Sequence, residues 1–235
     1  MLSIAVHASG SSGNCYTVTN GNATVIMLDC GLPYRRIQQL TGFQHPDAVF
    51  VTHEHNDHIK AAKDFMKKGV DVYMSRGTME AAGLEKSHRL NILKNRQSVS
   101  IDGIIVSAFD TQHDAVEPLG FLIDDGDDRI LYATDTYYLH YKFPGLTKIM
   151  IEANYSEPIL EENVYRGSVP EKLRKRLRQS HFSLENLKGF FKENDLSKVK
   201  EIWLIHLSNG NADPVRFRNE IETLTGRPVY VAGID

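Results

Sequence analysis

The feature that most constrains this chain is a short apolar run that leads directly into a cluster of histidine and acidic residues. Residues 48–59 read AVFVTHEHNDHI, and the run AVFV predicts a strand that is buried on both faces. His53 and His55 lie two positions apart, so in an extended backbone their side chains point the same way and can bind one ion. Asp57 and His58 follow where the chain turns into a helix, and they can serve a second ion beside the first. An isolated HxH is more often a solvated loop, but HxHxDH directly after a buried strand predicts a metal site.

One motif cannot complete two metal sites, because a catalytic zinc typically takes three protein ligands and a water. Three further candidates each follow a predicted apolar strand: His113 follows residues 104–109, Asp135 follows residues 130–133 and His206 follows residues 201–205. Each alone would more often be a structural polar group, but the repeated arrangement is what a site at one edge of packed sheets requires. Four other histidines are assigned structural roles and are not taken as metal ligands: His7, His45, His88 and His140.

The hydrophobic pattern predicts short strands separated by turns and helices. Helices are expected from about residue 31 to 40, from about residue 58 to 68, after residue 151 and over residues 213–224. The sequence DGD at residues 125–127 is a hairpin turn signal. The expected strands are residues 3–7, 16–19, 23–28, 48–51, 72–75, 104–109, 119–123, 130–133, 148–151, 201–205 and 229–231. Many antiparallel strands, with helices able to cover their outer faces, suggest two packed sheets flanked by helices.

Composition limits the remaining classes of protein. At 235 residues, 41% of them apolar, the chain can bury a full core as a single domain over residues 1–235. A net charge of −3 shows no global basic surplus for nucleic acid, although a local patch is compatible with it. No apolar run approaches membrane-spanning length, and Cys15 and Cys30 are too few for a disulfide framework. A cytoplasmic setting without membrane contact is therefore expected.

The motifs together resemble those of the metallo-β-lactamase-fold hydrolases over nearly the whole chain. HxHxDH, a lone histidine, a strand-end aspartate and a late strand-end histidine form the signature of that family. The segments ASGSSGNCYTV, LDCGL, VTHEHNDHI, IEANY, SHFSLENL and IHLSNGN look like the small bacterial hydrolases of the YycJ/WalJ group, which resemble nucleases. QHDAVEPLGF and SHFSLENLKGFF are also similar to parts of the ribonuclease Z-type phosphodiesterases. The resemblance implies a mixed α/β fold, the four-layer αββα sandwich, with a dinuclear metal centre.

Carried onto this chain, the resemblance also implies which residues hold which ion. His53, His55 and His113 would hold one ion, Asp57, His58 and His206 the other, and Asp135 would lie between them. Two divalent ions, zinc first and manganese second, would bridge a hydroxide and neutralise the oxygens of an in-line displacement. Iron and cobalt suit the same imidazole and carboxylate donors. Asp57 would then be a catalytic residue as well as a ligand, because it can orient the hydroxide.

Three features favour a phosphodiester substrate, and each has a plainer explanation. His181 in SHFSLEN precedes a helix with Ser183 as its candidate N-cap, and the resemblance to ribonuclease Z-like enzymes implies that this histidine is a second catalytic residue that handles phosphate. It is otherwise a structural histidine. The basic run EKLRKRLRQ at residues 171–179 either binds phosphate or forms a solvated helix face. The loop SGSSGN at residues 9–14 could hold a phosphate through its backbone N–H groups, which is a weak signal.

The function expected first is a metal-dependent phosphodiesterase or nuclease that acts on DNA, RNA or a nucleotide. The alternatives are a hydrolase of cyclic or other small nucleotides and, more distantly, a lactamase or thioesterase, which would not need His181 or the basic run. A non-catalytic module would be expected to have lost ligands, and this chain retains all of them. Four tyrosines have two alternative roles: they either stack one base near the metals or are ordinary surface and core residues. They are Tyr137, Tyr138, Tyr141 and Tyr155. The oligomeric state is open between a monomer and a homodimer.

Overall fold

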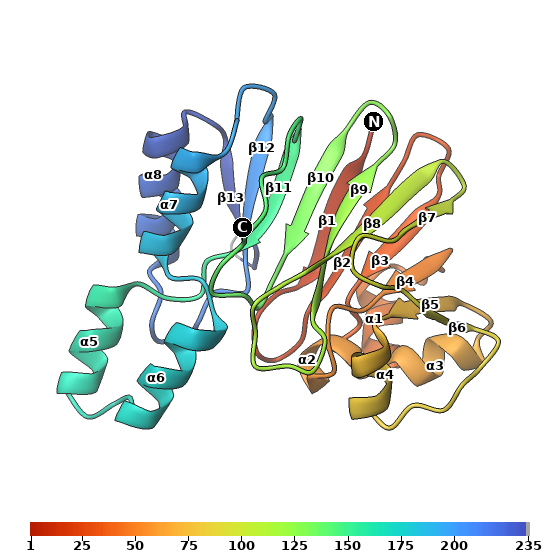
Figure 1. Cartoon of the computed structure of the whole chain (residues 1–235), viewed down its shortest axis with the longest axis horizontal. Helices are drawn as coiled ribbons and strands as arrows, with labels where there is room; N and C mark the ends of the chain where they lie inside the picture. The colour runs from red at the N-terminus through yellow and green to blue at the C-terminus, as the bar shows by residue number, and fades with distance from the viewer. Residues whose placement is uncertain (234–235) are drawn as a thin grey trace. The chain divides into compact units, whose positions relative to one another are not determined.

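The chain forms two compact units in a computed structural model that describes residues 1–233 (Figure 1). The first unit comprises residues 1–110 and 115–128, and the second comprises residues 111–114 and the segment from residue 129 onward. The organisation of residues 1–235 as a single domain stays a prediction.

The first unit contains a six-stranded sheet in which each strand lies next to the one that precedes it in the sequence. β1 (Ser3–Ala8), β2 (Cys15–Thr19) and β3 (Val25–Leu28) pair antiparallel. β4 (Ala48–Phe50), β5 (Asp71–Met74) and β6 (Leu90–Ile92) extend the sheet from β3 in parallel. Its helices are α1 (Tyr34–Leu40), α2 (Asn56–Ile59), α3 (Ala62–Lys67) and α4 (Arg76–Ala81). In a second sheet, antiparallel pairing joins β7 (Ser98–Ile101), β8 (Ile104–Asp110) and β9 (Leu119–Asp124).

The second unit is built on four parallel strands. They are, in order, β10 (Arg129–Ala133), β11 (Lys148–Glu152), β12 (Glu201–Ile205) and β13 (Val229–Val231). The helices of this unit are α5 (Glu157–Tyr165), α6 (Glu171–Ser180), α7 (Leu184–Glu193) and α8 (Pro214–Thr225), and α8 packs against both β13 and α7 (Figure 1). The expectation of many antiparallel strands therefore fails for β10 to β13 and for β3 to β6. Their connections are long enough for the crossovers that parallel pairing requires.

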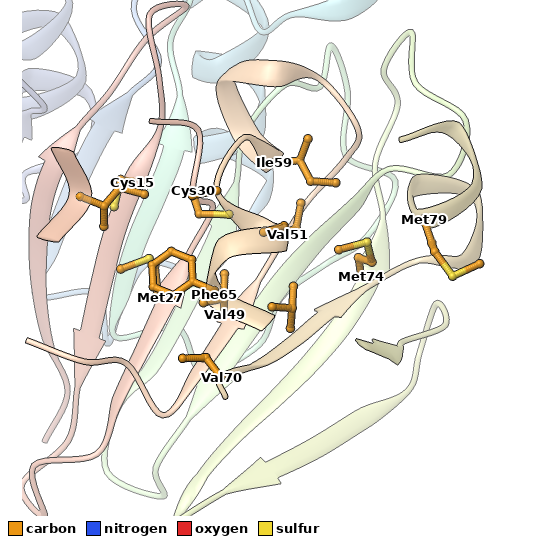
Figure 2. Packing of buried hydrophobic residues seen from close by; sticks show 14 residues of the cluster. Cys15, Met27, Cys30, Val49, Val51, Ile59, Phe65, Val70, Met74 and Met79 are labelled. Carbon is orange, nitrogen blue, oxygen red and sulfur yellow. The ribbon is translucent and has the colours of Figure 1, made fainter. Parts of the chain in front are cut away.

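The core of the first unit fixes the strand that carries the first motif. Figure 2 shows apolar side chains from the sheet packed with Phe65 of α3 in one cluster. Val49 and its neighbours in β4 have no exposed surface, which confirms the prediction of a strand buried on both faces. Cys15 and Cys30 belong to the same cluster (Figure 2), and burial, with a smaller effect from the charge of Asp29, raises the pKa of the Cys15 thiol to about 12. The two cysteines are core residues.

The helix expected over residues 58–68 is interrupted. α2 ends at Ile59 and α3 begins at Ala62, and Ala61 between them has φ −95° and ψ 3°. The backbone N–H of Ala61 donates to the carbonyl of Cys30 at 2.9 Å, and the N–H of Cys30 donates to the carbonyl of His58 at 2.7 Å. These bonds to another segment replace bonds within a helix, so the hydrophobic period alone could not predict the break. α4, β6 and β7 were also not predicted.

Gly31 permits the close approach of two segments that belong to separate motifs of the sequence, LDCGL and VTHEHNDHI. A Cβ atom at Gly31 would lie 1.6 Å from the backbone oxygen of Asp57. We therefore expect Gly31→Ala to lower the free energy of unfolding by about 3 kcal/mol or more, because the backbone itself must move. Urea denaturation followed by circular dichroism measures this change.

The matched control for this substitution is Gly189→Ala in α7. A Cβ atom at Gly189 meets nothing within 4 Å, so the alanine is expected to leave stability unchanged or to raise it by up to about 1 kcal/mol. Equal stabilities of the Gly31→Ala variant and the wild-type chain would contradict the close approach to Asp57.

No helix in residues 1–233 is both long enough and apolar enough to cross a bilayer. The cytoplasmic location stays a prediction.

Candidate metal centre

The first unit brings four of the predicted ligands together directly after β4. His53 Nε2 lies 3.0 Å from His55 Nδ1, and the ring centroids of His53 and His58 are 4.1 Å apart. His58 Nε2 lies 3.5 Å from a carboxylate oxygen of Asp57. His53 and His58 are buried, whereas His55 and Asp57 are partly exposed. The loop therefore gathers imidazole nitrogens and a carboxylate within a few ångströms, partly open to solvent.

Asp29 orients His58 from the strand end next to it. Asp29 Oδ2 lies 2.8 Å from His58 Nδ1, and both side chains are fully buried. Because a carboxylate only accepts, the Nδ1 atom of His58 carries the proton and Nε2 carries the lone pair. Asp29 also accepts from the backbone N–H of Thr52 at 2.9 Å, which ties β3 to the start of the ligand loop. Asn14, from the glycine and serine loop, places its amide nitrogen 3.0 Å from His58 Nε2.

The second unit brings the other three predicted ligands together around Asp135. Asp135 Oδ2 lies 3.6 Å from His113 Nε2, and Asp135 Oδ1 contacts His206 Nδ1. The side chains of His113, Asp135 and His206 are 1%, 3% and 4% exposed. His113 Nδ1 lies 2.8 Å from the carbonyl oxygen of Ser180, so Nδ1 donates and Nε2 is the atom that faces Asp135. Two histidines far apart in the sequence thus present ring nitrogens to one carboxylate.

Glu152 is a buried carboxylate that sequence reasoning did not assign. Its Oε1 atom lies 2.6 Å from His181 Nδ1 and 3.1 Å from His206 Nδ1. Its Oε2 atom accepts from the backbone N–H of Thr136 at 3.0 Å and of Phe182 at 3.1 Å. Ligand-type atoms of Glu152, His181, Asp135 and His206 all lie within 4.8 Å of one another. Glu152 therefore holds His181 beside two of the predicted ligands.

The environment of the second unit gives its histidines different protonation tendencies. Burial lowers the pKa of His113, and the nearby charge of Asp135 offsets only part of that effect. Burial also acts to lower the pKa of His181, but the charge and hydrogen bond of Glu152 outweigh it and raise that pKa. Burial acts to raise the pKa of Glu152, whereas the charge of His181 and the hydrogen bonds from both histidines hold it below its usual range. The pKa of His113 thus lies below that of an ordinary histidine and the pKa of His181 above it.

Two of these ligands sit in a backbone conformation that costs energy. Asp135 has φ +48° and His206 has φ +53°, and Asp29 in the first unit has φ +56°. Non-glycine residues in this region typically cost about 1–3 kcal/mol each and persist where the surroundings fix them. Asp135 and His206 both follow the ends of parallel strands, β10 and β12. The left-handed conformation thus occurs within two residues of the end of each strand.

The donor atoms in each unit suit divalent metal ions. His58 and His113 each donate Nδ1–H to an oxygen, so Nε2 is the ring atom that could coordinate an ion, which is the usual arrangement of metal-binding histidines. Metal binding requires neutral imidazole and ionised carboxylate, and the lowered pKa of His113 agrees with that requirement. Imidazole and carboxylate donors without thiolate suit zinc, and also manganese, iron and cobalt.

The structure describes two of the features that favoured a phosphodiester substrate, the cap that follows His181 and the basic run. Ser183 is the N-cap of α7, where its side chain accepts from the N–H of Asn186, as predicted. The basic run lies on α6, but much of its charge is neutralised: Arg174 and Arg178 pair with Glu161, and Arg176 pairs with Asp114. These ion pairs fit the plainer explanation, a solvated helix face.

Two residues that orient the ligands were missed, although the sequence carried a signal for both. Asp29 directly follows β3 and Glu152 ends β11, so each is a polar side chain at the end of an apolar strand. That is the same signal that selected Asp135. Glu54, which lies between His53 and His55 in the sequence, accepts from the backbone N–H of Val116 at 2.9 Å.

Comparison with known proteins shows the family of the chain. A family model described as "Beta-lactamase superfamily domain" matches residues 24–206, well over half of the chain. The chain is 27% identical over 223 residues to the exodeoxyribonuclease WalJ of Streptococcus pneumoniae serotype 2 (strain D39), covering 88% of this chain and 82% of that protein. It is also 27% identical over 146 residues to a ribonuclease Z of Archaeoglobus fulgidus, covering 51% of this chain and 47% of that protein.

A solved structure confirms the fold class. The metallo-β-lactamase fold protein YhfI from Bacillus subtilis superimposes with a TM-score of 0.76 at 17% sequence identity, covering 98% of this chain and 95% of that one. The predicted mixed α/β class, the αββα sandwich of the metallo-β-lactamase fold, is thereby confirmed. The chain therefore belongs to the beta-lactamase superfamily, and it is a hydrolase with the metallo-β-lactamase fold.

Proposed function

We propose that this protein is a metal-dependent phosphodiesterase that cleaves nucleic acid. The observation that carries the proposal is His181, a histidine that is not needed as a metal ligand and is held by Glu152 beside Asp135 and His206. A lactamase or thioesterase needs no such additional proton donor. The similarity to a named exodeoxyribonuclease and to a named ribonuclease Z supports nucleic acid as the substrate class.

Two divalent ions would be held by the seven predicted ligands. These are His53, His55, Asp57 and His58 of the first unit and His113, Asp135 and His206 of the second. When bound, such ions lower the pKa of a water and neutralise phosphate oxygens during an in-line displacement. Zinc is the first choice and manganese the second, since the donor set suits both.

The side chains of the protein would supply the remaining functions. Asp57 accepts a hydrogen bond from the attacking water and so sets its direction, in addition to its role as a ligand. His181 donates a proton to the leaving oxygen, and Glu152 keeps its Nδ1–H engaged so that Nε2 faces away from the carboxylate. Asp29 fixes the tautomer of His58.

The proposal predicts phosphodiester cleavage that depends on added metal. We expect the chelated protein to lose activity toward bis-p-nitrophenyl phosphate and single-stranded DNA or RNA, and Zn²⁺ or Mn²⁺ to restore it. Initial rates before and after metal reloading measure this effect, with cyclic nucleotides, double strands, a β-lactam and a thioester in the same panel. Turnover of the β-lactam or the thioester with all phosphodiesters untouched would overturn the proposal. Activity confined to cyclic or small nucleotides would favour the small-nucleotide alternative.

A further inference from the structure

A pocket of about 350 Å³ opens in the second unit between the segment after Asp135 and helix α7. Its volume lies at the lower end of the range of about 300–1,000 Å³ that is typical of small-molecule sites. Leu139, Phe182 and Phe190 contribute buried apolar surface to it. Tyr137 and Tyr138 line it with side chains that remain 36% and 47% exposed. The pocket thus combines an apolar floor with aromatic rings that a ligand can reach.

The tyrosine segment is tied to the residues of the proposed reaction. Thr136 donates its backbone N–H to Glu152 at 3.0 Å and its hydroxyl to the carbonyl of Tyr138 at 2.7 Å. The backbone N–H of Tyr137 donates to the carbonyl of Gln112, next to His113, at 3.1 Å. Tyr138 is three residues from Asp135, a separation that an extended chain spans in at most about 11 Å. The pocket wall is therefore fixed at short range from a predicted metal ligand.

The far side of the pocket is fixed in the same way to His181. Helix α7 begins at Leu184, three residues after His181, and contributes Asn186 and Phe190 to the lining. The Asn186 side-chain amide donates to the carbonyl of Tyr137 at 3.5 Å, and the Asn194 side chain accepts from the N–H of Phe143 at 3.3 Å. Both walls are thus attached to residues that would act on one scissile phosphate.

The charges around the pocket distinguish a base from a phosphate. Glu185 and Glu193 lie on its rim, and the one lysine there, Lys142, is paired with Glu193 at 3.0 Å. An acidic rim repels phosphate, but its carboxylates can accept hydrogen bonds from the exocyclic amino groups of bases. Tyrosine rings stack on any base, since every base has a π face. The lining therefore suits an uncharged, flat, hydrogen-bonding ring.

We propose that this pocket binds one unpaired nucleobase of a single-stranded substrate, with Tyr138 as a stacking platform, next to the phosphate that is cleaved. The proposal rests on the proposed phosphodiesterase function and adds to it a preference for single strands, because a paired base cannot enter the pocket. Of the other two tyrosine candidates, Tyr141 also lines the pocket, whereas Tyr155 does not: it is 1% exposed and its hydroxyl bonds to Glu157.

The test uses short single DNA strands in which one nucleotide at a time is replaced by an abasic residue. For the metal-loaded wild-type protein, kcat/KM is expected to fall at one position by about 5- to 150-fold, as loss of stacking worth about 1–3 kcal/mol implies. The Tyr138→Ala variant should lose this difference between intact and abasic strands, and Tyr138→Trp should retain it. The Tyr137→Ala variant and the double variant with both Tyr137→Ala and Tyr138→Ala show whether the ring of Tyr137 also stacks on the base. The matched control is Tyr165→Ala, whose ring is 90% exposed on α5, outside the pocket.

A binding measurement separates failure of the pocket from failure of the proposed function. A phosphorothioate strand that resists cleavage carries fluorescent 2-aminopurine at each position in turn, and stacking in the wild-type protein should quench it at one position but not in Tyr138→Ala. Quenching without cleavage of any strand would keep the base pocket and refute the phosphodiesterase. Cleavage that is equally fast for every abasic strand, or quenching that survives in the double variant, would overturn the base pocket.

Discussion

The Asp135→Asn variant is expected to lose at least about 10³-fold in turnover and to bind less metal than the wild-type chain. Asp135 is the carboxylate that both His113 and His206 approach in the second unit, so its charge is the natural counterpart of two cations. Metal ions typically contribute several kcal/mol of charge stabilisation in the transition state, and about 4 kcal/mol corresponds to about 10³ in rate. Asparagine is chosen because it tolerates the positive φ of +48° at this position better than alanine does.

Two measurements check this prediction: elemental analysis after reloading with Zn²⁺ or Mn²⁺, and the rate with bis-p-nitrophenyl phosphate. The matched control is Asp128→Asn, because Asp128 is equally buried but accepts from the backbone N–H of Leu2 at 3.0 Å. The control should lose some stability and keep its metal and its rate. Full metal content and full turnover in Asp135→Asn would refute the bridging role, and well under one metal ion per wild-type chain would refute the metal centre.

The His181→Ala variant is expected to keep its metal and its melting temperature but to lose about 10²-fold in turnover of nucleic acid. General acid assistance is typically worth about 10²–10⁴ in rate. His181 is held by Glu152 at 2.6 Å with its side chain 13% exposed, so its removal takes away a proton donor and little of the core. The loss should be smaller for substrates with a p-nitrophenol leaving group, which needs little protonation. This dependence on the leaving group separates a proton donor from a merely structural histidine.

Rates with both kinds of substrate, together with metal content, decide the role of His181. The matched control is His7→Ala, a partly buried histidine that bonds to the hydroxyl of Thr17 at 2.9 Å in the first unit. It should retain full activity on both kinds of substrate. Loss of metal or unfolding of the His181→Ala variant would make this residue a ligand or a structural group, and unchanged activity would exclude it from the reaction.

Local sequence patterns predicted the parts of the fold that depend on near neighbours. The apolar run of β4 predicted a strand buried on both faces, and the spacing of His53 and His55 predicted side chains that meet. Ser183 was predicted as the cap of α7, and residues 125–128 form the expected turn, where the N–H of Asp125 donates to the carbonyl of Asp128. In each case the deciding interactions lie within a few residues, where periodicity and capping are informative.

Partners that are distant in the sequence could not be predicted in this way. Asp29 bonds to His58 across 29 positions, and Glu152 bonds to His206 across 54. Arg178 of the basic run is neutralised by Glu157 and Glu161 of the preceding helix, a pairing that the run itself does not encode. A polar residue at a strand end has many potential partners, and only the folded chain selects one.

The sequence by itself therefore predicted the candidate ligand residues, the strands that carry them and the family to which the chain belongs. Local periodicity and motif spacing suffice for this, because they depend on covalent geometry and on the burial of apolar side chains. Only the tertiary structure decided the tautomers of the histidines, the buried carboxylate that holds His181, the break between α2 and α3 and the base-sized pocket beside α7. Each of these depends on hydrogen bonds or surfaces shared by segments that meet only when the chain folds.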